Sequence, residues 1–221
     1  QFKFIYGDIL RGRLISRDDK LEGYVIAGPK KQSISVQPNQ IKLVGSFKEM
    51  DLRNLSKFKI NSNSLSGNPF FIDNLNIGQT KLSSTLIIDT NINMEPSQDG
   101  LFFTLKNKDF FGSVLLRNNQ EIDLKLDFLK LDINQTQEDA FFLNIFNTVN
   151  NPILFSVESL LMGPKSYGNW GFKLLPSKDS LALVDIQGRY GRWEVTKDND
   201  SQESELLITK NSFGWDSRLK T

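Results

Sequence analysis

Short runs of alternating apolar and polar residues recur along almost the whole chain of 221 residues. Successive side chains of a strand point to opposite faces, so a period of two indicates strands with one apolar face. The clearest apolar sets are Leu101, Phe103 and Leu105; Ile122, Leu124, Leu126 and Phe128; Ile153, Phe155 and Val157; Trp170, Phe172 and Leu174; and Leu82, Ser84, Leu86 and Ile88. Strands do not alternate with long helices, which favours an all-β fold over a parallel α/β sheet.

Turn-forming residues separate these runs, as at Pro96–Gly100, Asn118–Asn119 and Pro176–Asp179. Strands joined by tight turns pair antiparallel with their neighbours. The sequence therefore predicts an elongated, twisted antiparallel sheet.

One segment departs from the strand pattern. Thr136 has the character of a helix cap, and the apolar residues that follow it are at helical spacing up to Val149. We expect a short connecting helix near residues 137–149. Its apolar stripe either covers an edge of the sheet or forms a lid over a binding surface.

Blocks of the sequence recur at intervals of about 80 residues. Four pairs align in the same order: Phe47–Leu52 with Phe128–Ile133, Asn68–Ile72 with Asn151–Phe155, Pro96–Leu101 with Pro176–Leu181, and Phe111–Val114 with Tyr190–Trp193. Repeats of strands stack into quasi-one-dimensional arrays. We predict repeats of about five strands at 47–127 and 128–205, the tail of an upstream repeat at 1–46, and the start of a following one at 206–221. The chain is then expected to be a piece of a longer array.

Composition removes several classes of chemistry. The chain has no Cys and no His, which excludes disulfides, thiol nucleophiles and the commonest general base and metal ligand. We assign no catalytic residue, metal or cofactor, and we expect no enzyme. The 27 Lys and Arg residues nearly balance the 26 Asp and Glu residues. Small basic clusters, such as Lys30–Lys31 and Arg189–Trp193, are therefore interpreted as solvated strand faces, and no nucleic-acid partner is expected.

The order of these blocks resembles the AsmA-like superfamily of bacterial envelope proteins, most closely its YhdP-type branch. The stretch Leu124–Asp132 is similar to the family's leucine–aspartate strand before a variable connector, and Pro152–Val157 follows as its next strand. Tyr167–Gly171 matches a Gly-centred turn, and Gly191–Trp193 and Phe213–Trp215 are similar to its Gly-x-Trp elements. The resemblance spans about residues 40 to 221. The chain departs from the family in being richer in Phe, Lys and Asn.

The resemblance implies a U-shaped β-groove with an apolar floor that conducts phospholipids between the inner and outer membranes. It also implies a periplasmic location within an inner-membrane-anchored protein of a Gram-negative bacterium. Partners would be phospholipids, together with membrane surfaces or proteins reached through regions outside this fragment.

The candidate lipid-binding floor consists of the stronger apolar face of four strands: Leu101, Phe103, Leu105, Leu124, Leu126, Phe128, Ile153, Phe155, Val157, Trp170, Phe172 and Leu174. The same alternation would arise in a closed β-sandwich, where the faces pack against each other. The alternative is therefore a closed β-sandwich or β-solenoid that serves as a scaffold or binding module of the cell envelope, without lipid transport.

Overall fold

The computed structural model describes residues 1–17, 20–29, 34–51, 69–82, 85–131, 151–176, 180–190, 193–195 and 206–209. Within these ranges the ordered elements are all strands, which confirms the all-β prediction. The helix predicted near 137–149 lies outside the described residues. The chain divides into two compact units, Gln1–Asn107 (unit 1) and Lys108–Thr221 (unit 2), and each is described by itself.

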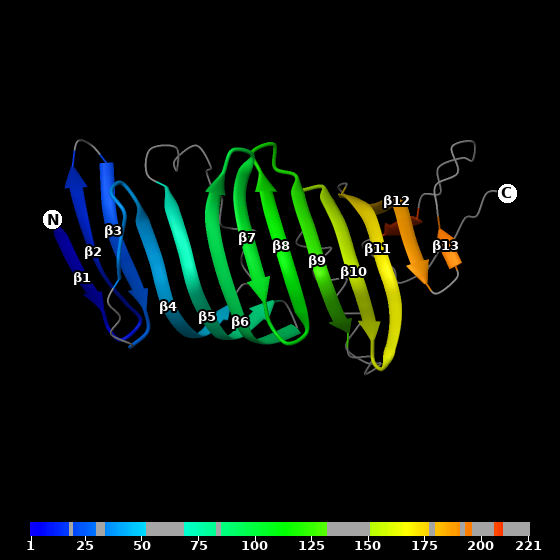
Figure 1. Ribbon diagram of the computed structural model, residues 1–221, viewed down its shortest axis with the longest axis horizontal. Helices are drawn as coiled ribbons and strands as arrows, with labels where there is room; N and C mark the ends of the chain where they lie inside the picture. The colour runs from blue at the N-terminus through cyan, green and yellow to red at the C-terminus, as the bar shows by residue number, and fades with distance from the viewer. Residues whose placement is uncertain are drawn as a thin grey trace. The chain divides into compact units, whose positions relative to one another are not determined.

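The described strands of unit 1 form one open sheet whose spatial order follows the chain (Figure 1). Its strands are β1 (Phe2–Tyr6), β2 (Leu10–Arg17), β3 (Lys20–Ala27), β4 (Ile41–Asp51), β5 (Phe70–Leu82), β6 (Thr85–Ser97) and β7 (Gly100–Lys106). Because β1 pairs with β2 alone among the described strands, this sheet does not close on itself.

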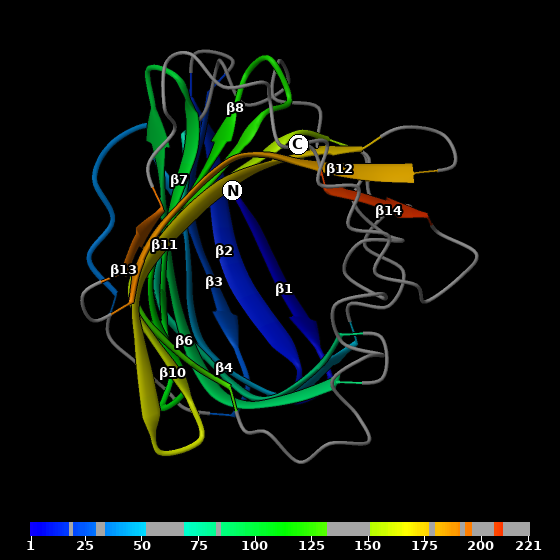
Figure 2. The ribbon, with the colours of Figure 1, turned by 90° about the vertical axis from the view of Figure 1, so that its right-hand side faces the viewer.

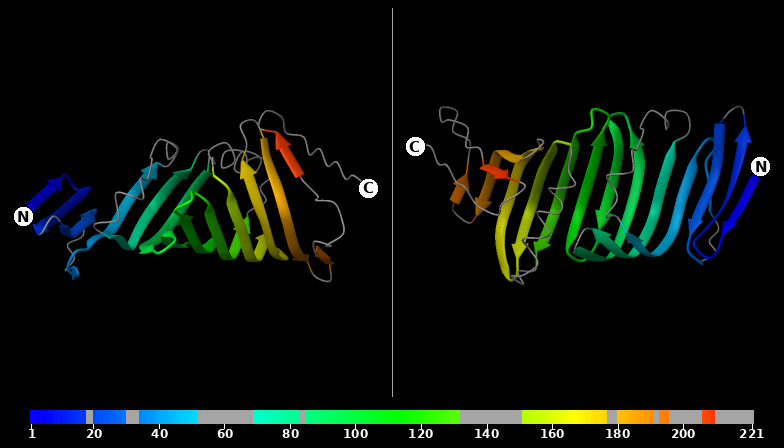
Figure 3. Two further views of the ribbon diagram at one scale, coloured as in Figure 1. Left: turned by 90° about the horizontal axis from the view of Figure 1, so that it is seen from above. Right: turned by 180° about the vertical axis from the view of Figure 1, so that it is seen from behind.

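Unit 2 is likewise an open sheet, in chain order from β8 to β13. Its strands are β8 (Phe110–Arg117), β9 (Ile122–Leu131), β10 (Ile153–Met162), β11 (Lys165–Pro176), β12 (Ser180–Tyr190), β13 (Trp193–Val195) and β14 (Leu206–Thr209). The short β13 and β14 pair with opposite ends of β12. Figure 3 shows β14, in red, beside β12.

Most neighbouring strands are antiparallel, as predicted, but three described pairs are parallel: β3 with β4, β4 with β5, and β9 with β10. Each parallel pair follows a long connection, at residues 28–40, 52–69 and 132–152. A parallel partner requires a crossover of about a dozen residues or more, because the chain must return to the end where the previous strand began. The direction of a strand therefore depends on the length of the connection before it.

The strands repeat in the way that the sequence blocks do. In unit 1, β4 is followed by a long connection, a parallel partner and two antiparallel strands, and β9 to β12 have the same arrangement in unit 2. The domain boundaries predicted from the repeat, at 46/47, 127/128 and 205/206, stay predictions.

The run Leu82, Ser84, Leu86 and Ile88 is not a single strand, so this interpretation was wrong. Strand β5 ends at Leu82 and β6 begins at Thr85, and these two residues are cross-strand partners. The chain therefore reverses between them. No Gly, Pro, Asn or Asp marks this reversal in the sequence. The apolar residues at the end of β5 and the start of β6 therefore had the spacing of one continuous strand.

Bulges and glycines accompany the bending of the strands. Strands β6 and β11 curve strongly along their length (Figure 2). In β4 the pairing with β5 shifts register between Val44 and Ser46, and the intervening Gly45 has φ +111°. A Cβ atom at Gly45 would lie 2.2 Å from the carbonyl oxygen of Ala27. Glycine is required here both for the backbone angle and for the close approach of β3.

We expect Gly45→Ala to destabilise unit 1 by about 3 kcal/mol, because the substitution combines a strained φ with a backbone clash. The matched control is Gly7→Ala. Gly7 also has positive φ, +53°, but no atom lies within 4 Å of its added Cβ. That control should cost only about 1 kcal/mol. Hydrogen exchange of peptides from β3 to β5, followed by mass spectrometry, measures the effect of each substitution on stability. Equal losses of protection in the two variants would contradict the steric role of Gly45.

Candidate functional site

A continuous apolar surface extends across β9, β10 and β11 of unit 2. Cross-strand partners project from the same face of a sheet, so the register determines which side chains meet. Three rows result: Ile122, Ile153 and Leu174; Leu124, Phe155 and Phe172; and Leu126, Val157 and Trp170. We call these nine residues the apolar face of unit 2. Eight of them belong to the predicted floor, and Ile122 was named in the same strand pattern.

The middle row is the more accessible part of this face. Phe155 and Phe172 stack with ring centroids 4.6 Å apart and an interplanar angle of 19°, and both remain only half-buried. On one side of them Ile153 and Leu174 are buried together, with 7% and 4% of their surface exposed. The two stacked rings therefore form an apolar platform, a flat surface that remains partly exposed to solvent.

Trp170 is held in place by a hydrogen bond. Its indole Nε1 donates to the carbonyl oxygen of Tyr167 at 2.7 Å, while the ring stays half-buried beside Val157 in the last row. A buried or half-buried indole normally satisfies its N–H in this way. The bond fixes the orientation of the largest side chain of the face.

Strand β8 and the end of β9 extend the same face. Val114 is the partner of Leu124, so β8 continues the middle row with a residue that the sequence interpretation did not select. Phe128 lies on the same face as Leu126, with Phe111 and Ser159 as its partners on β8 and β10. Gly112 is the partner of Leu126, and its added Cβ would lie 2.2 Å from the Lys125 carbonyl oxygen.

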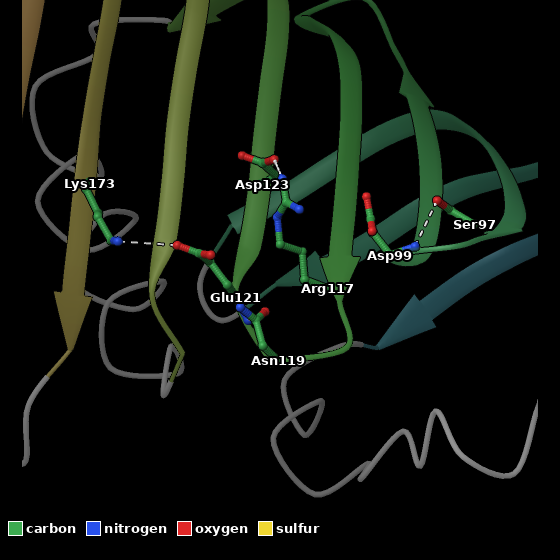
Figure 4. Close-up of polar contacts among 7 residues, drawn as sticks. All are labelled: Ser97, Asp99, Arg117, Asn119, Glu121, Asp123 and Lys173. Carbon is green, nitrogen blue, oxygen red and sulfur yellow. Dashed lines mark hydrogen bonds and ion pairs between the residues drawn. The ribbon is translucent and has the colours of Figure 1, made fainter.

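The reverse face of unit 2 carries polar groups, the exposed Leu154 and Leu175, and an ion pair whose carboxylate is buried. Arg117 Nη2 lies 2.6 Å from Asp123 Oδ2, and the Asp123 side chain is only 6% exposed (Figure 4). The other carboxylate oxygen, Oδ1, is buried without a hydrogen-bond partner. Nearby, Lys173 Nζ lies 3.3 Å from Glu121 Oε1, and Asn119 Oδ1 accepts from the Glu121 backbone N–H at 3.1 Å.

Arg117→Leu should lower the free energy of unfolding of unit 2 by about 3 kcal/mol, because it leaves the buried Asp123 carboxylate uncompensated. Lys108→Leu is the control, since the Lys108–Asp109 pair is long, 3.9 Å, with the Lys108 side chain 73% exposed. It should cost less than about 0.5 kcal/mol. Tryptophan fluorescence during urea unfolding reports on unit 2, which contains all three tryptophans.

The double variant Arg117→Leu/Asp123→Leu should recover most of the stability, because two apolar groups replace the pair without leaving a buried charge. A double variant no more stable than Arg117→Leu would contradict the ion pair as the source of the loss.

In unit 1 the three predicted floor residues also share one face. Leu101, Phe103 and Leu105 of β7 pair with Pro96, Met94 and Ile92 of β6. Ile92 and Met94 pair in turn with Leu75 and Ile72 of β5. Leu75, Ile77 and Met94 are more deeply buried than the predicted residues, with exposures of 2%, 1% and 6%. The sequence interpretation did not select these three.

A bulge in β5 explains the omission. The register shifts between Ile72 and Leu75, and Asn74 between them has φ +53°. The shift places Ile72 and Leu75 on one face although they are three residues apart, which breaks the period of two. In β6, polar and apolar residues alternate regularly from Asn91 to Met94. This pattern could have identified the same apolar face from the sequence.

Asparagine side chains stabilise this bulge on the polar face. Asn91 Nδ2 donates to Asn74 Oδ1 at 2.6 Å and to Asn76 Oδ1 at 3.0 Å. Asn93 Oδ1 accepts from the backbone N–H of Asn74 at 2.8 Å. Amide side chains thus satisfy groups that the regular strand ladder leaves unpaired. A longer contact lies in the β6–β7 turn, where the Asp99 N–H donates to Ser97 Oγ at 3.4 Å (Figure 4).

The described parts of the chain contain no cluster of three or more acidic, His or Cys residues that could hold a metal ion. Those parts also include no helix with the length and apolarity needed to cross a bilayer. Comparison of the chain with protein-family models, curated proteins and solved structures gave no match.

Proposed function

We propose that this chain is a segment of a periplasmic β-groove that shields the acyl chains of phospholipids and conducts them between the inner and outer membranes. The observation that carries the proposal is the row of Leu124, Phe155 and Phe172, in which apolar side chains from three strands align on one face and remain partly exposed. The resemblance to the AsmA-like proteins supports the same function.

The free energy of acyl chains in water explains why such a face is needed. Two acyl chains contain roughly thirty methylenes at about 0.8 kcal/mol each, so exposing them fully costs roughly 20 kcal/mol or more. An apolar surface that extends from strand to strand lowers this cost along the path without creating one deep site. The head group can stay in water, so the surface needs no specific polar ligand.

The construction of each unit also supports an open face. Within each unit the described strands form one sheet, and no second described sheet packs on the apolar side. In a closed sandwich, the alternative structural hypothesis, the two apolar faces would bury one another. A single sheet with half-buried Phe rings instead leaves surface for a mobile apolar ligand.

The proposal involves no catalysis and no cofactor, because a lipid that moves along an apolar surface undergoes no covalent change. Placement in the periplasm, anchoring at the inner membrane and contact with either membrane through regions outside this fragment belong to the same proposal. Charged and polar side chains on the reverse face, such as Lys125, Ser156 and Lys173, suit an aqueous compartment.

Photo-crosslinkers placed at adjacent positions of β10 test the one-sided lipid surface. A crosslinker at Phe155 should capture phospholipid, whereas one at Leu154, on the opposite face of the same strand and 42% exposed, should capture at least about fivefold less. Phe103 and Phe172 should behave like Phe155, and Lys125 and Glu158 like Leu154. Mass spectrometry of the crosslinked products gives the yields, and equal yields on the two faces would reject the proposal.

Phe155→Arg should slow lipid transfer by the full-length protein, because a guanidinium on the stacked platform must be desolvated whenever a chain passes. Leu154→Arg carries the same change on the reverse face and should leave transfer unchanged. Transfer between donor and acceptor vesicles, with circular dichroism to verify folding, measures both. Transfer that is unaffected by Phe155→Arg in a folded protein would count against the groove and favour a scaffold.

A further inference from the structure

Unit 1 contains a cavity of about 770 Å³ where its sheet changes width. The last partners of β3 and β4 are Ala27 and Gly45, and β4 then continues to Asp51 without β3 beside it. The cavity lies at this step. Its size is typical of small-molecule sites, which range from about 300 to 1,000 Å³. None of the twelve predicted floor residues lines it.

Apolar side chains from separate strands provide its walls. Ile9, in the turn between β1 and β2, is 53% exposed, and Phe47 and Ile77 are cross-strand partners on β4 and β5. Gly28 connects these parts, because its N–H donates to the Ile9 carbonyl at 2.8 Å. A Cβ on Gly28 would lie 2.5 Å from the Ser46 carbonyl oxygen, so glycine allows the walls to approach.

The charged residues around this apolar lining are mainly acidic. Asp8, Glu49 and Asp89 line the cavity together with Lys48, and the Arg11 guanidinium donates to the carbonyl oxygen of the lining residue Pro29 at 2.9 Å. The Glu49 carboxylate is paired with Lys81. Asp8 and Asp89 have no ion-pair partner among the residues that the structure describes. The rim thus presents two unpaired carboxylates, and a positively charged ligand group would be attracted to it.

A buried hydroxyl neighbours the lining residues Ile77 and Asp89, although Thr90 does not itself line the cavity. Thr90 is the cross-strand partner of Ile77, so both side chains project from one face, and Thr90 follows Asp89 directly. Thr90 is 6% exposed, and its Oγ1 has no hydrogen-bond partner in the described part of the chain. Buried hydroxyls are normally paired.

We infer that this cavity binds a lipid whose head group carries an ammonium ion. The acyl portion lies against Ile9 and Phe47, and the ammonium lies beside Asp8 and Asp89. This inference rests on the proposed function and deepens it: the unit 2 face accepts acyl chains without regard to the head group, whereas the cavity of unit 1 discriminates between head groups by charge.

Isothermal titration with two single-chain probes tests the inference. Lysophosphatidylethanolamine and lysophosphatidylglycerol share an acyl chain but differ in the ammonium group. The native chain should bind the former about fivefold more tightly, as expected for two exposed ion pairs, and added salt should reduce the difference. Asp8→Asn/Asp89→Asn should bring the ratio below about twofold. Ile9→Ser should weaken the binding of both probes equally, which would show that both bind in the cavity.

The matched control removes two exposed carboxylates from unit 2. Asp127→Asn/Glu158→Gln changes the net charge of the chain by the same amount and should preserve the fivefold ratio, so a general charge effect is distinguished from the cavity. Equal binding of the two probes to the native chain, or a ratio unchanged in Asp8→Asn/Asp89→Asn, would overturn the inference. If the inference fails but a crosslinker at Phe155 still captures lipid, the proposed function is retained. If Phe155 captures no lipid, both the inference and the proposed function are rejected.

Discussion

The parallel pairing of β9 with β10 places Leu124 beside Phe155, and the antiparallel pairing of β10 with β11 places Phe155 beside Phe172. A slip of one residue between β9 and β10 would bring Asp123 or Lys125 into the apolar row, because the side chains of a strand alternate between faces. A slip between β10 and β11 would bring Lys173 or Gly171 into it. The whole apolar face of unit 2 therefore depends on register. The ion pair of Arg117 and Asp123 constrains the adjoining β8–β9 register, since a slip of one residue there would separate the buried carboxylate from Arg117.

An apolar face on a single sheet is costly in water unless something covers it. Most globular sheets bury such a face against helices or a second sheet. Here Val157 and Leu174 are nearly inaccessible, whereas the stacked rings of Phe155 and Phe172 keep part of their surface exposed. A partly exposed apolar surface of this kind can serve as a binding surface. A ligand that is itself apolar and mobile would cover the exposed part without fixing the sheet in a closed form.

The sequence predicted the apolar residues of β9, β10 and β11 because their alternation is unbroken. It failed for Leu75 and Ile77, because the bulge at Asn74 changes the phase of the strand and no single-strand pattern contains that change. The parallel direction of β10 was also not predicted, since alternation is the same in both directions. The cavity of unit 1 could not be predicted at all. Its walls come from a turn and from separate strands. Only the pairing of these strands shows that β4 extends beyond the end of β3.

The proposed function requires that the apolar faces accept acyl chains. The most direct measurement is native mass spectrometry of the folded chain after incubation with phospholipid vesicles and reisolation by size exclusion. We expect complexes whose added mass equals that of intact phospholipid and that are lost when Phe155 and Phe172 are both replaced by Asp. A folded chain that emerges free of lipid, or the same lipid load on the doubly substituted chain, would contradict it.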